Sequence, residues 1–239
     1  MVMKSSDLKI IIFNSPYYSM ANNDFAQLMF GKIINSRIQT YYTYHGEGVF
    51  PLGVEDFISD HIIVSHVKEN IFEPIASIKM VEKTVCDFFG QRLPIESWLS
   101  HKVNNSSIYE SVNTFLNKND GICYTGSYSC IKINSEIDSL VHKLIAIGIY
   151  KLMQSKLCKH NFAAGLKTGQ RFMNYVGWEL FDERTVTIPD IKNQKGFVYK
   201  LTNFSEKLLQ DYNKYIDFWE KRIEISAPKS HARDGVLAA

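Results

Sequence analysis

Glu55, Asp60 and two histidines stand close together in the segment VEDFISDHIIVSHV, at residues 54–67. Glu55 and Asp60 could hold an ammonium group or take its proton, and histidine is the side chain best tuned to take a proton near neutral pH. His61 and His66 share one β-branched run, where side chains alternate between faces, so we do not expect them to act together. Glu55, Asp60 and His66 are the candidate acid–base residues. A solvated surface position is the alternative for both acids, and a structural role is the alternative for the histidine.

The composition sets the class of protein. Of the 239 residues, 45% are hydrophobic and 22% are charged, which suits one large domain or two small ones with a sizeable core. The net charge of +2 is not that of a nucleic-acid-binding protein, so we expect no nucleic-acid partner. The first apolar run, residues 8–13, is too short for a transmembrane segment and has no cleavage site of a signal peptide.

The cysteines give no sign of a metal site. Cys86, Cys123, Cys130 and Cys158 form no CxxC pair and no cluster with histidine. We therefore expect no metal, and four reduced thiols in a cytoplasmic protein.

The hydrophobic pattern predicts an alternation of strands and helices. The expected strands are residues 8–13, a hairpin over 60–82 with a longer turn at 68–74, and residues 121–133, 161–166, 178–183 and 196–202. The expected helices are residues 24–36, two short helices within 86–117, and residues 135–157, 168–177 and 205–225; residues 37–53 are expected to form an ordered loop.

Two helix ends are marked by particular residues. Ser135 with Asp138 three residues later is typical of an N-terminal capping box for the long helix. In FMNYVGW, Gly177 can adopt a positive φ that ends the helix just before Trp178.

This order of elements, together with the FMNYVGW ending, resembles the Gcn5-related N-acetyltransferase (GNAT) fold across residues 60–200. The resemblance implies an α/β (α+β) protein with a central mixed β-sheet flanked by helices. It also implies that the strands at 126–133 and 161–166 splay apart in a V. The usual pyrophosphate loop is missing, because NSEIDSLVH carries Glu136 and Asp138 and neither glycine nor arginine. We therefore expect weak binding of free coenzyme A, or none.

Residues 50–185 are similar to one branch of this fold, the acyl-homoserine-lactone synthases and long-chain N-acyl amino acid synthases. Glu55 and Asp60 match the outer members of the acidic motif Glu-x-Asp-x-x-Asp, and Phe57 replaces the middle one. IASIKMV matches the strand of that branch, with Lys79 in the arginine position. In GSYSCIKI, Ser129 matches, while Ser127 and Cys130 replace a glutamate and an arginine.

The resemblance implies an acyltransferase that moves a medium or long acyl chain from an acyl carrier protein (or acyl-CoA) thioester to an amine such as an amino acid. The strand SYSCIKI would offer backbone donors to the thioester or its pantetheine arm, and a plain core strand is the alternative. The implied substrate-binding residues are Lys79, Ser127, Tyr128, Ser129, Cys130 and Trp178.

Two further points follow from this reading. Five basic residues could steer an acidic carrier protein, or merely complement helix ends: Lys151, Lys156, Lys159, Lys167 and Arg171. We expect residues 1–204 to form the acyltransferase domain, 205–225 a closing helix and 226–239 a mobile tail. Because charged motif positions are lost, a degenerate relative that binds an acyl chain or a protein partner is the alternative function.

Overall fold

Strands rich in isoleucine and valine form the centre of the molecule, in a computed structural model that describes residues 3–46, 52–100, 106–188, 191 and 194–227. The described strands join in the order β6-β8-β5-β4-β3-β2-β1-β9, and β7 also pairs with β8. They are β1 (Leu8–Phe13), β2 (Asp60–Lys68), β3 (Ile71–Glu82), β4 (Ile122–Cys130), β5 (His160–Gly165), β6 (Glu179–Leu180), β7 (Val186–Ile188), β8 (Gln194–Leu201) and β9 (Ile223–Ile225). The pairings β1–β9 and β4–β5 are parallel and the others antiparallel, so the sheet is mixed as predicted.

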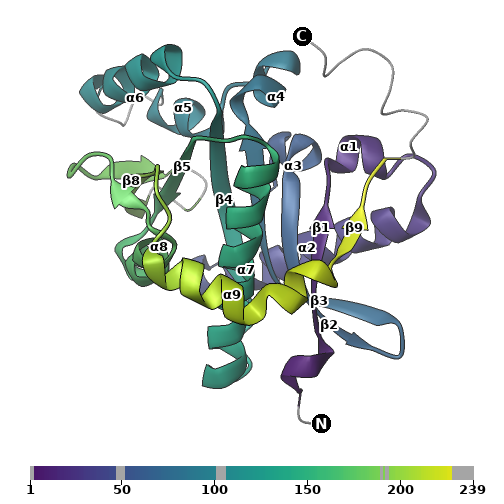
Figure 1. Ribbon diagram of the computed structural model, residues 1–239. Helices are drawn as coiled ribbons and strands as arrows, with labels where there is room; N and C mark the ends of the chain where they lie inside the picture. Colours follow the sequence, from purple (N-terminus) through teal and green to yellow (C-terminus); the bar gives the residue numbers. More distant parts are fainter. Residues whose placement is uncertain (1–2, 47–51, 101–105, 189–190, 192–193, 228–239) are drawn as a thin grey trace.

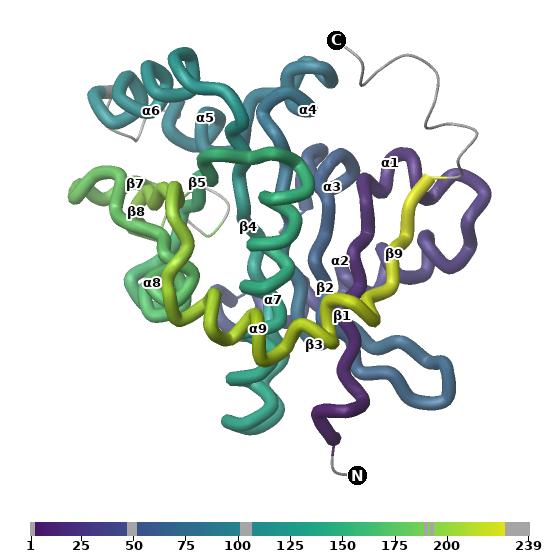
Figure 2. The backbone as a smooth tube through the Cα atoms, viewed as in Figure 1, coloured from purple at the N-terminus to yellow at the C-terminus, as the bar shows by residue number. Residues whose placement is uncertain are grey.

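Helices cover both faces of the sheet (Figures 1 and 2). They are α1 (Pro16–Ser19), α2 (Asp24–His45), α3 (Glu55–Ile58), α4 (Lys83–Phe88), α5 (Pro94–Leu99), α6 (Ser106–Lys118), α7 (Ser135–Ser155), α8 (Gln170–Val176) and α9 (Glu206–Glu220). One hydrophobic cluster joins α7 and α9 to the sheet face that carries Ile62 and Ile78. The opposite face carries Ile63 and Val81 and packs against α2 and against α4–α6. We call these the α7 face and the α2 face.

The predicted splay of the sheet is confirmed. β4 and β5 pair only through Ile122–His160, Cys123–Asn161 and Tyr124–Phe162, whereas β5 continues to pair with β8 as far as Gly165. The two strands therefore share one end and separate at the other (Figure 2).

Gly177 ends α8 as predicted. Its φ is +112°, and a Cβ there would lie 2.6 Å from the carbonyl oxygen of Asn203. Only glycine fits such a position without strain. Trp178 follows directly and is 2% exposed, with its indole Nε1 donating to the carbonyl of Asn161 at 3.3 Å.

Several predicted boundaries were wrong. The expected loop at 37–53 is helical up to His45, because Arg37 and Thr40 continue the buried stripe of α2, and Gly46 with φ +75° ends the helix. The hairpin turn is only Glu69 and Asn70, both with positive φ, in place of the longer turn at 68–74.

Other differences concern helix ends and extra elements. Three described helices, α4, α5 and α6, replace the two short helices expected within 86–117. The cap of α7 is Asn134, not Ser135. The closing helix ends at Glu220, and β9 then pairs with β1. From residue 228 on, the predicted tail lies outside the described residues.

Candidate active site

A cavity of about 1430 Å³ lies where β4 and β5 separate. Its wall includes Ala163, which packs in the cluster on the α7 face, and Ala164, which packs in the cluster on the α2 face. Since successive side chains of a strand point to opposite faces, the cavity passes through the sheet from one face to the other. Small residues in the separated part of β5 leave this space open.

Lys79 sits between two carboxylates at the wall of this cavity. Its Nζ lies 2.9 Å from Glu55 Oε1 and 2.9 Å from Asp56 Oδ2. Asp56 also pairs with Arg37, and both of these side chains are fully buried. Glu55 and Lys79 line the cavity, with Asp56 and Arg37 behind them. Two positive and two negative charges therefore balance in one cluster.

Electrostatics hold this cluster in its ionised form. Burial raises the pKa of Asp56, but the positive charges of Lys79 and Arg37 lower it, and the net pKa is about 2. His61 packs beside the cluster, and burial followed by the charge of Arg37 lowers its pKa to about 3. His61 is therefore neutral in the folded protein at ordinary pH.

Both ring nitrogens of His61 are occupied. Its Nδ1 lies 2.9 Å from Arg37 Nη2 and its Nε2 lies 2.7 Å from the carbonyl oxygen of Asp56. Because arginine only donates, Nδ1 must accept, and Nε2 carries the proton that it donates to the carbonyl. This histidine is a structural link and is not among the residues that line the cavity.

Sequence reasoning missed Arg37 and Asp56. Arg37 lies on the buried stripe of α2, four residues after Ile33, and a single charge on an apolar helical stripe is the signal that could have found it. Asp56 was passed over because the motif match assigned its neighbours Glu55 and Phe57. The short helix α3 turns Glu55 and Asp56 toward Lys79, whereas Phe57 packs with the α2 core.

Asp60 lies apart from the cavity. It begins β2 and points to the α7 face, as Ile62 does, while His61 points to the α2 face. Its carboxylate accepts from the backbone N–H of Ser15 at 3.0 Å and pairs with Lys156 Nζ at 2.9 Å. Burial lowers the pKa of Lys156, but Asp60 and Glu82 together raise it more, so the net pKa is above its usual value.

His66 also lies away from the cavity, near the hairpin end of the sheet. Its ring nitrogens are 4.0 Å from Asp7 Oδ2 and 4.0 Å from Glu73 Oε2. The structure thus brings Glu55 and Lys79 together but separates both from Asp60 and His66.

The middle of β4 forms part of the wall. Ser127 has φ +54°, and the register with β3 shifts between Ser77 and Lys79 opposite it, which marks a β-bulge. Gly126, Ser127 and Tyr128 line the cavity. Ser129 points to the α2 face, where its hydroxyl lies 3.0 Å from that of Ser77.

Of the predicted residues, Glu55, Lys79, Ser127, Tyr128 and Trp178 line the cavity, and Asp60, His66, Ser129 and Cys130 do not. Burial raises the pKa of Cys130 to about 11, which leaves it a thiol at neutral pH. All four cysteines are free. Among the described residues, no group of histidine, cysteine and acidic side chains has the arrangement of a metal site.

Aromatic side chains line the α7 side of the cavity. The rings of Tyr128 and Phe172 stack with centroids 5.2 Å apart, and the Tyr128 hydroxyl hydrogen-bonds to Nδ1 of His142. Burial lowers the pKa of His142. Sequence reasoning did not consider this histidine, which lies on α7.

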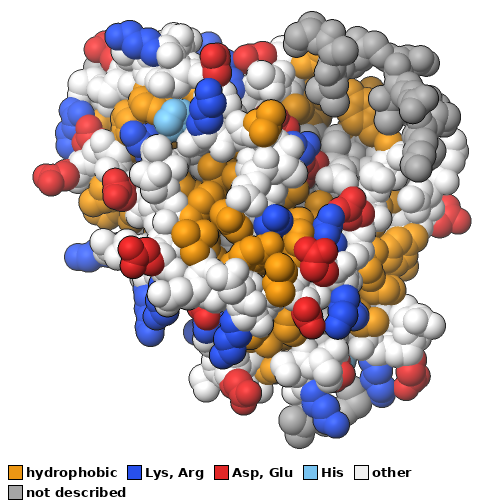
Figure 3. Space-filling view, in the orientation of Figure 1, with side chains coloured by type: hydrophobic (Ala, Val, Ile, Leu, Met, Phe, Trp, Pro, Cys, Tyr) orange, Lys and Arg blue, Asp and Glu red, His pale blue; other side chains and the backbone are white. Residues whose placement is uncertain are grey.

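Cations lie at the α7 side as well. Lys143, Arg171 and Lys207 line the cavity, and Lys143 pairs with Asp211 at 3.2 Å. Of the five basic residues proposed from the sequence, only Arg171 lines the cavity. On the face shown in Figure 3, positive and negative side chains are mixed around α9, and hydrophobic side chains reach the surface around α7.

The start of α7 is closed by its own cap. The side-chain oxygen of Asn134 accepts from the backbone N–H of Glu136 at 3.1 Å and of Ile137 at 2.9 Å. Asp138 accepts from the N–H of Ile133 at 2.9 Å. The amides of Glu136 and Ile137 would otherwise be among the donors that a helix N-terminus offers to a phosphate.

Comparison with known proteins defines the class of fold. No family model and no curated protein matches the chain by sequence. Among solved structures, BjaI, a CoA-dependent acyl-homoserine lactone synthase, matches with a TM-score of 0.55 and 8% identity over 93% of this chain and 95% of its own. FeeM, an N-acyl amino acid synthase from uncultured soil microbes, matches with a TM-score of 0.51 and 9% identity over 75% of this chain and 91% of its own. A protein from Lactobacillus plantarum assigned as an N-acetyltransferase matches with a TM-score of 0.50 and 12% identity over 81% of this chain and 96% of its own.

The chain therefore has the acyl-CoA N-acyltransferase (GNAT-like) fold, and the predicted fold class is confirmed. Its structural neighbours include the acyl-homoserine-lactone and N-acyl amino acid synthases, the branch expected from the sequence. None of the described helices combines the length and the apolar character that crossing a membrane requires.

Proposed function

We propose that this chain is an N-acyltransferase that moves a medium or long acyl chain from a thioester carrier to the amine of an amino-acid-like acceptor. The observation that carries this proposal is the cavity that passes through the sheet beside the Glu55–Lys79 pair. Its volume of about 1430 Å³ exceeds the roughly 300–1,000 Å³ of ordinary small-molecule sites. It has room for an acyl thioester and an acceptor at once.

The donor would enter from the α7 face. There Lys143, Arg171 and Lys207 offer positive charge to the phosphate of a pantetheine arm. Because Asn134 occupies the first amides of α7, the helix N-terminus is not offered to the pyrophosphate of coenzyme A. This favours an acyl carrier protein as donor, with acyl-CoA as the alternative.

The acceptor would bind on the α2 face. Glu55 uses Oε1 to bind Lys79, which leaves its second oxygen to hold the ammonium group. Arg92 lines the same side of the cavity and forms no ion pair with any other described side chain. A carboxylate on the acceptor would complement Arg92, and this is why we propose an amino acid.

The separated part of β4 would bind the thioester. Beyond Tyr124, β4 has no ladder with β5, so backbone N–H groups on that edge can face the thioester carbonyl. Donors placed where negative charge develops are the main means by which acyl transfer is accelerated. The bulge at Ser127 re-aims the backbone at this point.

Turnover with a panel of amino acids and acyl-carrier-protein or acyl-CoA thioesters tests the proposal, using mass spectrometry of the products. Glu55→Gln should lower kcat/KM by about 100-fold or more. Asp60→Asn is the matched variant outside the cavity, and its kcat/KM should fall by less than about threefold. An equal loss of kcat/KM in both variants would show that Asp60 also takes part in the reaction. Bound acyl chains without turnover for any donor and acceptor would instead favour the degenerate binding protein.

A further inference from the structure

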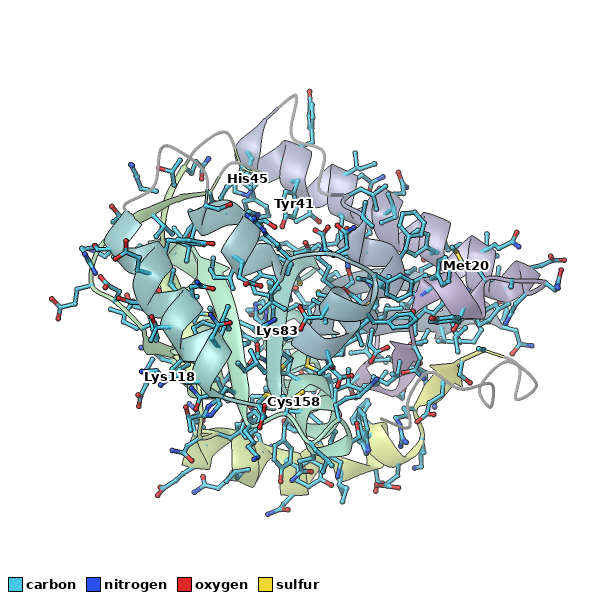
Figure 4. The ribbon with its side chains drawn as sticks, turned by 90° about the horizontal axis from the view of Figure 1, so that it is seen from above. Met20, Tyr41, His45, Lys83, Lys118 and Cys158 are labelled. Atoms are coloured by element: carbon cyan, nitrogen blue, oxygen red, sulfur yellow. The ribbon has the colours of Figure 1, made fainter. Side chains whose placement is uncertain are left out.

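His45, in the last turn of α2, lines the cavity and has a ring nitrogen without a partner among the described residues. Its side chain lines the cavity beside that of Tyr41, with ring centroids 5.3 Å apart. Figure 4 shows the two side chains next to each other at the end of the helix. Nδ1 of His45 is buried and hydrogen-bonds to no described residue.

A buried polar atom without a partner destabilises the folded protein, and such atoms are rare in native structures. At the wall of a cavity this cost is relieved when a ligand supplies the missing hydrogen-bond partner. Burial lowers the pKa of His45, and a side-chain hydrogen bond with Gln194 offsets this only in part. The imidazole is therefore neutral at neutral pH and has a nitrogen lone pair to offer.

We infer that His45 is the general base of the reaction, with Nδ1 taking a proton from the ammonium group of the acceptor. This inference rests on the proposed function. Glu55 would hold the ammonium by its charge, and His45 would remove one proton to leave a neutral amine. Both residues line the cavity, and His45 reaches it from α2, the helix of the acceptor side.

The steps balance without another reactant. The neutral amine attacks the thioester carbonyl carbon, and a C–N bond forms. As the tetrahedral intermediate collapses, the C–S bond breaks and the second amine proton passes to the leaving thiolate. The products are an amide and a thiol, and protonated His45 returns its proton to water.

Other candidate bases near the cavity are Glu55, His61 and His142, and each already has an ion-pair or hydrogen-bond partner. Glu55 is ion-paired with Lys79, and both ring nitrogens of His61 are hydrogen-bonded. The Nδ1 of His142 hydrogen-bonds to Tyr128, and His142 reaches the cavity from α7, on the donor side. His45 lies on the acceptor side, and its Nδ1 has no hydrogen-bond partner in the part of the chain that the structure describes.

Steady-state kinetics of the full chain test the inference, after turnover of the unsubstituted protein is established. His45→Ala should lower kcat by about 100-fold with KM changed by less than about threefold. Added imidazole should restore part of that loss. His45→Gln, which keeps a polar side chain of similar reach, should be as slow as His45→Ala. The matched control is His160→Gln, because His160 packs on Phe115 and does not line the cavity. Its kcat should stay within a factor of two.

The outcomes separate the inference from the proposed function. Full activity in folded His45→Ala, or a loss that imidazole does not restore, overturns the role of His45 and leaves acyl transfer intact. Circular dichroism and thermal melting show whether each variant is folded. If His45→Ala does not fold, the activity of His45→Gln provides the test. Absence of turnover in the unsubstituted protein with every donor and acceptor overturns both.

Discussion

Replacing Lys79 by methionine should destabilise the protein far more than the same replacement at Lys83. Both lysines contact a carboxylate at close range, at 2.9 Å for Lys79 with Asp56 and at 2.8 Å for Lys83 with Asp87. The two pairs differ in burial. The side chains of Lys79 and Asp56 are 3% and 0% exposed. Those of Lys83 and Asp87 are 22% and 56% exposed. Methionine keeps most of the length of lysine and removes its charge.

The expected cost follows from the state of Asp56. Its pKa is about 2 in place of 3.8, although burial alone would raise it. The lowered pKa corresponds to about 2 kcal/mol of stability that is fully present above about pH 4 and is lost as the pH falls toward 2. Lys79 is the larger of the favourable causes, and its loss leaves Asp56 with Arg37 alone.

We therefore expect Lys79→Met to lower the free energy of unfolding at pH 7 by about 3 kcal/mol, the cost typical of breaking a buried ion pair. Lys83→Met should cost about 0.5 kcal/mol or less, as for an exposed pair on a helix. Urea unfolding followed by circular dichroism measures both. The Lys79→Met cost should shrink between pH 7 and pH 3, because protonation of Asp56 removes the buried charge that has lost Lys79 as a partner. Equal costs in the two variants, or a Lys79→Met cost independent of pH, would refute this account.

Three further predictions address the histidine, the glycine and the donor. The pKa of His61 is about 3 in the folded protein and 6.5 ordinarily, so the unfolded chain takes up a proton that the folded protein does not. Between about pH 6.5 and pH 3 the free energy of unfolding should therefore fall by up to about 1.4 kcal/mol for each pH unit of acidification. Urea unfolding of His61→Gln should show a shallower pH dependence, and an unchanged slope would remove His61 as the cause. Gly177→Ala should lower the free energy of unfolding by about 2–3 kcal/mol, since the alanine would have a φ of +112° and its Cβ would lie 2.6 Å from a carbonyl oxygen. Gly31→Ala, where the added Cβ has no atom within 4 Å, should be neutral or stabilising by up to about 1 kcal/mol. Equal shifts of the melting temperature in the two variants would contradict this. Calorimetry with free coenzyme A should show a Kd weaker than about 100 µM, because the amides at the start of α7 are capped by Asn134, and micromolar affinity would disprove the argument.

The sequence by itself determined the main elements. β-Branched runs located β1, β2 and β3, apolar periodicity located α7, and Gly177 marked the end of α8. These signals are local, since a strand or a helix must bury one face and a residue with positive φ is cheapest as glycine. The order of these elements was enough to indicate the fold. The end of α2 was missed because the segment that contains Tyr41, Tyr42 and Tyr44 was interpreted as a loop.

Only the tertiary structure decided which charges meet. Asp60 and His61 are neighbours in sequence, yet one pairs with Lys156 on the α7 face and the other with Arg37 on the α2 face. Asp56 meets Lys79 across 23 residues of chain, and His45 meets Gln194 across a far longer segment. Sequence periodicity predicts which face of an element is buried. It carries no information about which distant side chain that face will contact, and ion pairs, pKa values and the shape of the cavity depend on those contacts.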